Sequence, residues 1–283
     1  MKILGNPFIA EDLSDSFTRV SALRSYPVFI AVMAAVMMIW WPRIPLTAHL
    51  RAGNAPETFF AVALCLFGCL AYLAARFGAE GFSNESASKI LDFVTLTPVP
   101  VSSVVAGRLS ASVIHTVFLL ALGLPFLFLG STVNGTAISV ISRVVLVSGT
   151  SALALRAFAF LCYVLLEPHR LLKDGVIIFC GLAFLIATTS AVQPLSPISA
   201  ILSLGEGAVF TALGPAVPFY LVSVIMSVLA AAVFSIAAGV WLRILRRRFA
   251  VRQNAAAAAN EARAERLLKR MWNEGGDEDD GSR

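Results

Sequence analysis

The chain has little charge for its length. Of its 283 residues, 14% are Asp, Glu, Lys or Arg, whereas 58% are hydrophobic. Soluble domains carry about a quarter charged residues, so this composition argues against a soluble globular enzyme. The charge is also unevenly placed, because residues 243–283 hold 10 of the 22 Lys and Arg residues and 7 of the 17 Asp and Glu residues. The sequence therefore predicts a membrane domain followed by a soluble appendage.

Motifs for catalysis and metal binding are absent from the sequence. It contains no G-x-x-x-x-G-K-[ST] phosphate loop, no H-E-x-x-H helix and no G-x-S-x-G elbow, so we expect no ATP site and no hydrolase machinery on this chain. The four cysteines, Cys65, Cys69, Cys162 and Cys180, fall within apolar stretches and show no disulfide or zinc spacing. We interpret them as small core residues and expect no bound metal or cofactor.

Six apolar stretches are long enough to cross the hydrocarbon core as helices, which requires about 20 residues each. The chain is thus predicted to be an all-α, polytopic membrane protein with its six-span domain over residues 26–248. The expected spans are Tyr26 to Trp41, Thr58 to Ala75, Leu109 to Gly130, Arg143 to Leu166, Gly175 to Val192 and Val217 to Leu242. The first is short, and it either begins at Tyr26 or extends back through Val20.

The distribution of Lys and Arg predicts the orientation. With both termini cytoplasmic, 18 of these residues lie on the inner side and three on the outer side, namely Arg43, Arg51 and Arg143. This bias follows the positive-inside rule. We therefore attribute the net charge of +5 to the Lys and Arg residues that orient the chain in the membrane. No nucleic-acid partner is expected.

Residues 1–25 are predicted to form a cytoplasmic helix in the plane of the interface. Asn6 can cap it, Pro7 suits its first position, and Asp12 is expected on its polar face. Apolar residues recur at spacings of four, four and three: Ile9, Leu13, Phe17 and Val20. This periodicity is typical of a helix that buries one face.

The sequence also predicts the local structure of two outer connections and of the C-terminal region. Asn134 and Gly135 predict a tight outer turn between the third and fourth spans. Residues 193–215 are apolar but interrupted by Pro and Gly, which predicts an outer re-entrant helical hairpin. Residues 249–283 are expected to form a cytoplasmic helix capped by Asn254 and then a disordered acidic tail. Just before this region, the basic run 246–248 is placed for contact with anionic membrane lipid.

The segment between the second and third spans, residues 83–98, is predicted to be a short helix on the cytoplasmic surface. Asn84 and Glu85 favour a helix start, and a stripe of apolar residues that includes Ile90 gives it one membrane-facing side. Thr97 and Pro98 end it, because a proline disfavours helical geometry in the preceding residue.

At this segment the sequence resembles a family. Residues 85–98 read Glu-Ser-Ala-Ser-Lys-Ile-Leu-Asp-Phe-Val-Thr-Leu-Thr-Pro and are followed by Gly107-Arg108. They are similar to the E-R-E-x-x-G-T-L-E-x-L-x-x-T-P…G-K pattern of permease subunits of ABC-2 type ATP-binding-cassette exporters. Asn6-Pro7 and residues 196–199, Ser-Pro-Ile-Ser, also resemble conserved stretches of that family. The chain departs from the family at Ser86 and at Lys89-Ile90, and Asp92 stands where the family has Glu.

The resemblance implies an exporter permease that carries no ATPase site of its own and is therefore not an enzyme. In the family, this segment is the coupling helix that docks onto a separate ATP-binding subunit, which holds ATP and Mg²⁺. By this likeness Glu85, Asp92, Thr97 and Pro98 are the expected docking residues. A second permease copy or paralogue and the bacterial inner membrane are also implied.

Two polar residues within the expected spans are candidates for a translocation path. Arg156 lies near the middle of the fourth span, where a charge costs roughly 3 kcal/mol or more. It either lines a path for an anionic or amphipathic substrate or bonds to carbonyls and hydroxyls, and no carboxylate within a span offers it an ionic partner. His115, at a comparable depth in the third span, is expected to be a hydrogen-bonded packing residue rather than a proton carrier.

Two other functions are compatible with the sequence. An ion-coupled secondary transporter would commonly use intramembrane carboxylates and internal repeats, which are not visible here. A non-transporting membrane anchor or scaffold would use the charged region after Asn254 to recruit a partner.

Overall fold

The computed structural model describes residues 7–18, 20–41, 57–80, 100–165, 181, 195–206, 209–210 and 217–275. This part of the chain is almost entirely helical. Its elements are α1 (Pro7–Thr18), α2 (Val20–Ile39), α4 (Glu57–Glu80), α6 (Val101–Asn134), α7 (Ile138–Leu165), α9 (Pro197–Glu206), β1 (Val209–Phe210), β2 (Val217–Pro218) and α10 (Phe219–Gly275).

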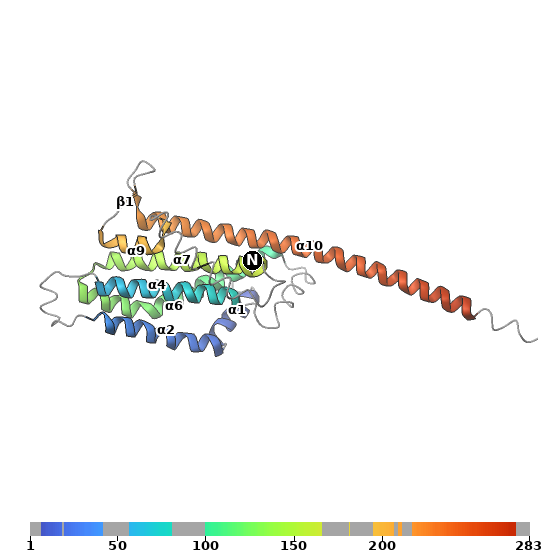
Figure 1. Ribbon diagram of the computed structural model, residues 1–283, viewed down its shortest axis with the longest axis horizontal. Helices are drawn as coiled ribbons and strands as arrows, with labels where there is room; N and C mark the ends of the chain where they lie inside the picture. The colour runs from blue at the N-terminus through green and yellow to red at the C-terminus, as the bar shows by residue number, and fades with distance from the viewer. Residues whose placement is uncertain are drawn as a thin grey trace, which may run out of the picture.

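The long helices lie side by side in one bundle, with α7 packed against α4, α6, α9 and α10 (Figure 1). Tyr26, in the first half of α2, contacts His115, in the first half of α6. Trp40, which directly follows α2, contacts Thr58 at the start of α4. Contacts of Arg143 with Tyr220 and of Phe158 with Phe234 place α10 alongside α7 in the same direction.

Two groups of helices therefore run in opposite directions. The helices α2 and α6 run one way, and α4, α7 and α10 run the other way. We call the end formed by the start of α2, the start of α6 and α1 the α1 end. At the opposite end, β1 pairs with β2 in an antiparallel ribbon just before α10 begins (Figure 1).

The main core lies between α2, α4, α6 and α7, where aromatic and aliphatic side chains are almost fully buried. Phe59, Leu66 and Leu70 of α4 are completely enclosed, as are Met33 of α2 and Val144 of α7. A second cluster near the α1 end joins Val104 of α6 to Phe160 of α7 and Leu242 of α10. These contacts fix the depth of each helix relative to its neighbours.

The apolar helices agree with a membrane-embedded protein, but they are fewer than the six predicted. Within the described residues, four helices are long and apolar enough to cross a bilayer: Thr58–Gly78, Val101–Val133, Ile138–Leu165 and Phe219–Arg248. A fifth crossing is reached only if α2 is taken together with α1, from which it is bent by 62°. The predicted span over residues 175–192 lies outside the described residues, except for residue 181.

Local sequence signals explain two of the helix ends. Gly135 adopts φ of 64° and follows the last turn of α6, so the Asn134-Gly135 turn is confirmed. Glycine suits this left-handed conformation because it has no Cβ. At the other end of α6, Pro100 has extended geometry and the helix begins at Val101, eight residues earlier than the expected start of the span.

A helix forms in the predicted N-terminal region, but Asp12 is not on an exposed polar face. Helix α1 begins at Pro7, and Ile9 is buried. However, it ends at Thr18, and residues 20–25 belong to α2. Asp12, expected to face the polar side, is 8% exposed because it pairs with an arginine of α6.

The C-terminal prediction was wrong about the start of the second helix. Asn254 does not cap a new helix, since α10 continues unbroken from Phe219 to Gly275 and extends well beyond the bundle (Figure 1). No Gly or Pro lies between Gly239 and Gly275 to end it, and the alanine-rich run at 255–259 favours its continuation.

The described part of the predicted hairpin over residues 193–215 is not a pair of helices. One short helix, α9, is followed by the β1 strand, which pairs with β2. Ala200 and Ile201 of α9 are fully buried in the main core. The helix is therefore part of the bundle wall.

Candidate functional site: a buried charged cluster

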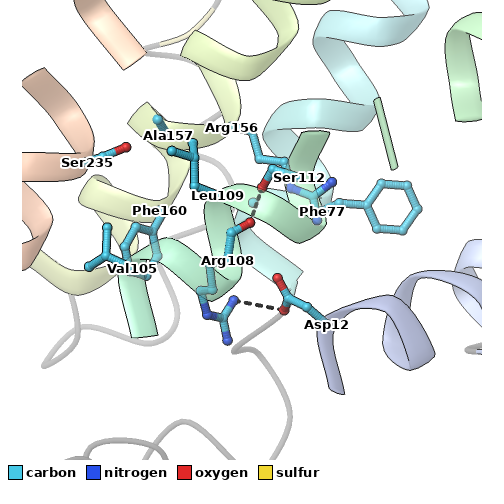
Figure 2. A pocket seen from close by; sticks show the side chains of 11 residues that line it. Asp12, Phe77, Val105, Arg108, Leu109, Ser112, Arg156, Ala157, Phe160 and Ser235 are labelled. Carbon is cyan, nitrogen blue, oxygen red and sulfur yellow. Dashed lines mark hydrogen bonds and ion pairs between the residues drawn. The ribbon is translucent and has the colours of Figure 1, made fainter. Parts of the chain in front are cut away.

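A charged cluster lies at the α1 end, where α1, α6 and α7 meet. Asp12 and Arg108 form an ion pair, with 3.2 Å between a carboxylate oxygen and a guanidinium nitrogen (Figure 2). Their side chains are only 10% and 12% exposed. The Arg108 guanidinium also lies 5.7 Å from the centre of the Phe160 ring, so it is held between a carboxylate and an aromatic face.

The cluster extends to a second arginine deeper in the bundle. Arg156 of α7 is 5% exposed and donates to Nδ1 of His115 at 2.8 Å. The Asp12 carboxylate attracts the charge of Arg156, whereas the charge of Arg108 repels it. The Asp12 carboxylate thus forms an ion pair with Arg108 and offsets part of the charge of Arg156 from a greater distance.

Hydrogen-bond chemistry assigns the protonation of His115. An arginine can only donate, so Nδ1 of His115 must accept and carry no proton. Its Nε2, 3.0 Å from the Tyr26 hydroxyl oxygen, then holds the ring proton and donates it. The Tyr26 hydroxyl in turn donates to the backbone carbonyl of Ser16. With His115 neutral and in this tautomer, each of the three hydrogen bonds from Arg156 to the Ser16 carbonyl has one donor and one acceptor.

This hydrogen-bond chain ties four helices together. It passes from Arg156 of α7 to His115 of α6, then to Tyr26 of α2 and the last turns of α1. Aromatic rings surround the imidazole, with the centre of Phe77 at 4.6 Å and that of Phe17 at 5.9 Å, both edge-on. His115 is 1% exposed, so water does not compete for its hydrogen bonds.

A close helix contact positions Arg156. A Cβ built on Gly78 of α4 would lie 2.7 Å from Cβ of Ala159 and 3.0 Å from the carbonyl oxygen of Arg156. Only glycine therefore permits α4 to approach α7 this closely. The approach also places Phe77, the neighbour of Gly78, against the imidazole.

The cluster borders a partly open cavity of about 20 Å³, whose polar lining residues are Asp12, Arg108, Ser112, Arg156 and Ser235 (Figure 2). This volume holds about one water molecule, and the polar lining offers such a water hydrogen bonds. The arrangement fixes charges and helix positions, and the cavity is too small for an organic substrate.

A larger, apolar cavity of about 270 Å³ lies between α7, α9 and α10. It is bordered by Phe158, Pro197 and Phe234, and the hydroxyls of Ser151 and Ser227 lie 3.2 Å apart on its wall. Its size and lining suit an apolar group.

The predicted path residues are therefore brought together, whereas the docking residues cannot be placed. Arg156 and His115 are in direct contact, and His115 is the hydrogen-bonded packing residue that the sequence favoured. The sequence predicts no ionic partner for Arg156 within the spans. In the structure Arg156 is hydrogen-bonded to His115, while the Asp12 carboxylate of α1 attracts its charge without a direct ion pair between them. Glu85, Asp92, Thr97 and Pro98 lie outside the described residues.

Asp12 and Tyr26 are the cluster members that the sequence analysis missed. Asp12 lies three residues after Ile9 and five before Phe17, both on the inward side of α1. The helical spacing of three to Ile9 was a signal that Asp12 shares this face.

The described cysteines form no disulfide. Cys65, Cys69 and Cys162 are partly buried thiols. Among the residues that the structure describes, no three His, Cys, Asp or Glu side chains lie close enough to hold a metal ion.

Comparison with known proteins leaves the family open. No protein-family model matches the chain, and no curated protein is significantly similar to it.

Proposed function

We propose that the chain is the membrane-spanning permease subunit of an ABC-2 type exporter in a bacterial inner membrane. The observation that carries this proposal is the meeting of α1 with the beginning of α6 at the end where α4 stops. The segment that resembles a coupling helix, residues 83–98, joins α4 to α6 at this end. A force applied there would act directly on the charged cluster.

The cluster gives such a force a route into the bundle. Arg108 lies seven residues after the start of α6 and is paired with α1. His115, two turns further on, is bonded to α2 and α7. Movement of the start of α6 therefore requires α1, α2 and α7 to move with it or the buried bonds to break. In an exporter, ATP-driven closure of the partner subunits would supply that movement.

The directions of the helices support six crossings with both termini on one side. Helix α7 ends at the α1 end, and α10 begins at the opposite end and runs in the same direction as α7. A crossing by the apolar stretch at residues 175–192 would connect these two ends. The Lys and Arg excess at the α1 end favours the cytoplasmic side for that end.

A second permease copy or paralogue has a suitable surface on α10. Exposed apolar side chains follow one stripe at spacings of four, four, three and four: Ile225, Leu229, Val233, Ile236 and Val240. This stripe faces either lipid or the second permease, and the dimer would enclose the translocation path between the two copies.

Co-purification tests the proposal. The full chain, extracted in mild detergent from its own host, is expected to capture a protein that carries a phosphate loop. Asp92→Arg should abolish the capture, whereas Thr132→Arg, an exposed position at the opposite end of α6, should leave it unchanged. A well-folded chain that captures no such protein, or equal capture by the Asp92→Arg variant, would contradict the proposal.

The buried cluster also favours a second candidate, an ion-coupled secondary transporter. The His115 imidazole and the Tyr26 phenol are hydrogen-bonded to each other, and the Asp12 carboxylate is paired with Arg108 of the same helix as His115. Such groups relay protons in carriers. Vesicles containing the chain alone separate the two functions. Uptake driven by a proton gradient without ATP would favour the carrier.

A further inference from the structure

The apolar cavity between α7, α9 and α10 belongs to neither proposed mechanism, and its two ends differ in chemistry. On α7 its lining extends from Ser151 to Phe158, seven residues or about 10 Å along the helix. At the first end the Ser151 hydroxyl lies 3.2 Å from the Ser227 hydroxyl of α10. Toward the α1 end the rings of Phe158 and Phe234 are in contact, with 5.2 Å between their centres. The cavity therefore has a polar end and an aromatic end.

The pair of serine hydroxyls can form a further hydrogen bond with a ligand. A hydroxyl has one proton to donate and two lone pairs with which to accept. Ser151 and Ser227 share one hydrogen bond, and in the described part of the chain neither hydroxyl has another partner. Whichever hydroxyl accepts this bond keeps its own proton. The polar end can thus donate to a ligand and can also accept from one.

Two further serines lie one helical turn beyond the polar end. Ser148 precedes Ser151 by three residues on α7, and Ser223 precedes Ser227 by four residues on α10, so each shares a helix face with the serine that follows it. Both are fully buried, and neither hydroxyl has a hydrogen-bond partner among the residues that the structure describes. The contact between α7 and α10 therefore stays polar on this side of the cavity.

The lining of the cavity carries no charge. The ten described residues that border it are two serines and eight residues with apolar side chains. An ion that entered would lose its hydration without gaining a counter-charge from these residues, which is very unfavourable. The cavity therefore favours a neutral ligand.

The volume of the cavity indicates the size of the ligand. An apolar protein cavity of about 150 Å³ binds benzene, which has six non-hydrogen atoms. In proportion, the 270 Å³ of this cavity suit a ligand of about eleven non-hydrogen atoms. Met226, which also lines the cavity, is 42% exposed. The cavity thus reaches the outer surface of α10, where a ligand can enter from the hydrocarbon core of the bilayer.

We propose that the cavity binds one neutral, mostly apolar molecule of about eleven non-hydrogen atoms that carries a single hydrogen-bonding group, such as a medium-chain alcohol. The polar group of the ligand bonds to the hydroxyls of Ser151 and Ser227, and its apolar chain lies toward Phe158 and Phe234. This binding needs no other protein. It can therefore be tested on the chain alone, and its outcome is separate from that of the proposed export function.

Photolabelling of the full chain in phospholipid vesicles tests the assignment. The probe is an analogue of 1-decanol with a diazirine on its chain, and mass spectrometry identifies the labelled residues. We expect saturable labelling within residues 151–158 and 226–234. Unlabelled 1-decanol should compete with the probe about 5-fold better than undecane, because a hydrogen bond contributes about this factor. Undecane has the same number of non-hydrogen atoms but no hydroxyl.

A charged competitor tests the neutrality of the ligand. The decyltrimethylammonium ion has a chain of the same length as 1-decanol and a permanent positive charge. We expect it not to compete with the probe, because the described lining offers no counter-charge.

Two variants separate the polar end from the apolar part. Ser151→Ala/Ser227→Ala should weaken labelling about 5-fold and remove the advantage of 1-decanol over undecane. Ala154→Leu fills part of the cavity and should weaken labelling about 10-fold, while both residues favour a helix. Ser142→Ala on α7 and Ala232→Leu on α10 are matched controls at exposed positions, and each should change labelling less than about 2-fold.

Several results would overturn the assignment. Labelling that does not saturate, or wild-type labelling of Ala154→Leu, would place the probe outside the cavity. Equal competition by undecane and 1-decanol, or wild-type labelling of the double serine variant, would show that the hydroxyls do not select the ligand and that the cavity takes any acyl chain. Competition by the decyltrimethylammonium ion as strong as that by 1-decanol would contradict a neutral ligand.

Discussion

Asp12 is the residue on which the buried charges at the α1 end depend. Its carboxylate pairs with Arg108 and also attracts Arg156, so its loss leaves two guanidinium groups without their shared counter-charge. Removing one partner of a buried ion pair costs about 3 to 5 kcal/mol. We therefore expect Asp12→Asn to lower the free energy of unfolding in detergent by about 3 kcal/mol. Glu261→Gln, which removes an exposed carboxylate from α10, should change it by less than about 0.5 kcal/mol. Equal stabilities of the two variants would contradict the role of Asp12.

The hydroxyl of Tyr26 is expected to stabilise the junction of α1 and α2. Tyr26→Phe removes the donor to the Ser16 carbonyl and the acceptor for the His115 ring. Leaving buried polar groups unpaired costs about 1 to 3 kcal/mol, and we expect a loss of that size in thermal or denaturant unfolding. Tyr72→Phe, at a tyrosine that is 51% exposed, serves as the matched control. An effect of Tyr26→Phe no larger than that of the control would argue against the hydrogen-bond chain.

At the scale of single residues, the sequence predicted how far along its helix a polar side chain lies better than it predicted the partner of that side chain. Equal depth of Arg156 and His115 could be counted along two helices, and the two side chains do meet. The pairing of Asp12 with Arg108 could not be counted in this way, because it depends on how α1 folds back against α6. A carboxylate outside the apolar stretches was assigned to the polar face of its helix, although the same helix turn carries the buried Ile9.

Among the elements, the α4 to α7 contact is the one most sensitive to a single methyl group. Gly78→Ala places a Cβ 2.7 Å from that of Ala159, so the helices must separate. Overpacking of this kind costs about 1 to 3 kcal/mol. Gly68→Ala on the same helix meets no neighbour and should stabilise the protein by up to about 1 kcal/mol. Unfolding of the two variants, measured side by side, should therefore shift in opposite directions. A shift in the same direction would mean that α4 is not held against α7 at Gly78.

The continuity of α10 can be measured directly. Spin labels at positions 251 and 269 are separated by 18 residues, or about 27 Å if the helix is unbroken. We expect a narrow distance distribution near this value. A broad distribution or a clearly shorter mean distance would indicate that the helix is interrupted at Asn254. Asn often caps helices and therefore predicts a boundary there, but no helix-breaking Gly or Pro lies nearby and strong helix formers surround it.

For the whole molecule, composition and hydropathy predicted the class of protein more reliably than the number of spans. The helical, membrane-embedded character follows from the length of the apolar stretches, and four of them are long enough as described. The first expected span was harder to predict, because α2 contains Pro27 and qualifies only together with the bent α1. The β1 to β2 ribbon could not be foreseen, since strands of two residues carry no periodicity.

The central claim is that residues 83–98 receive force from an ATP-binding partner. A photoreactive amino acid at position 97, activated in living cells, tests this most directly. We expect a covalent adduct with a protein whose peptides include a G-x-x-x-x-G-K-[ST] phosphate loop, and no such adduct from the same group at position 132. An expressed, membrane-inserted chain that forms no adduct from position 97, or forms the same one from position 132, would contradict it.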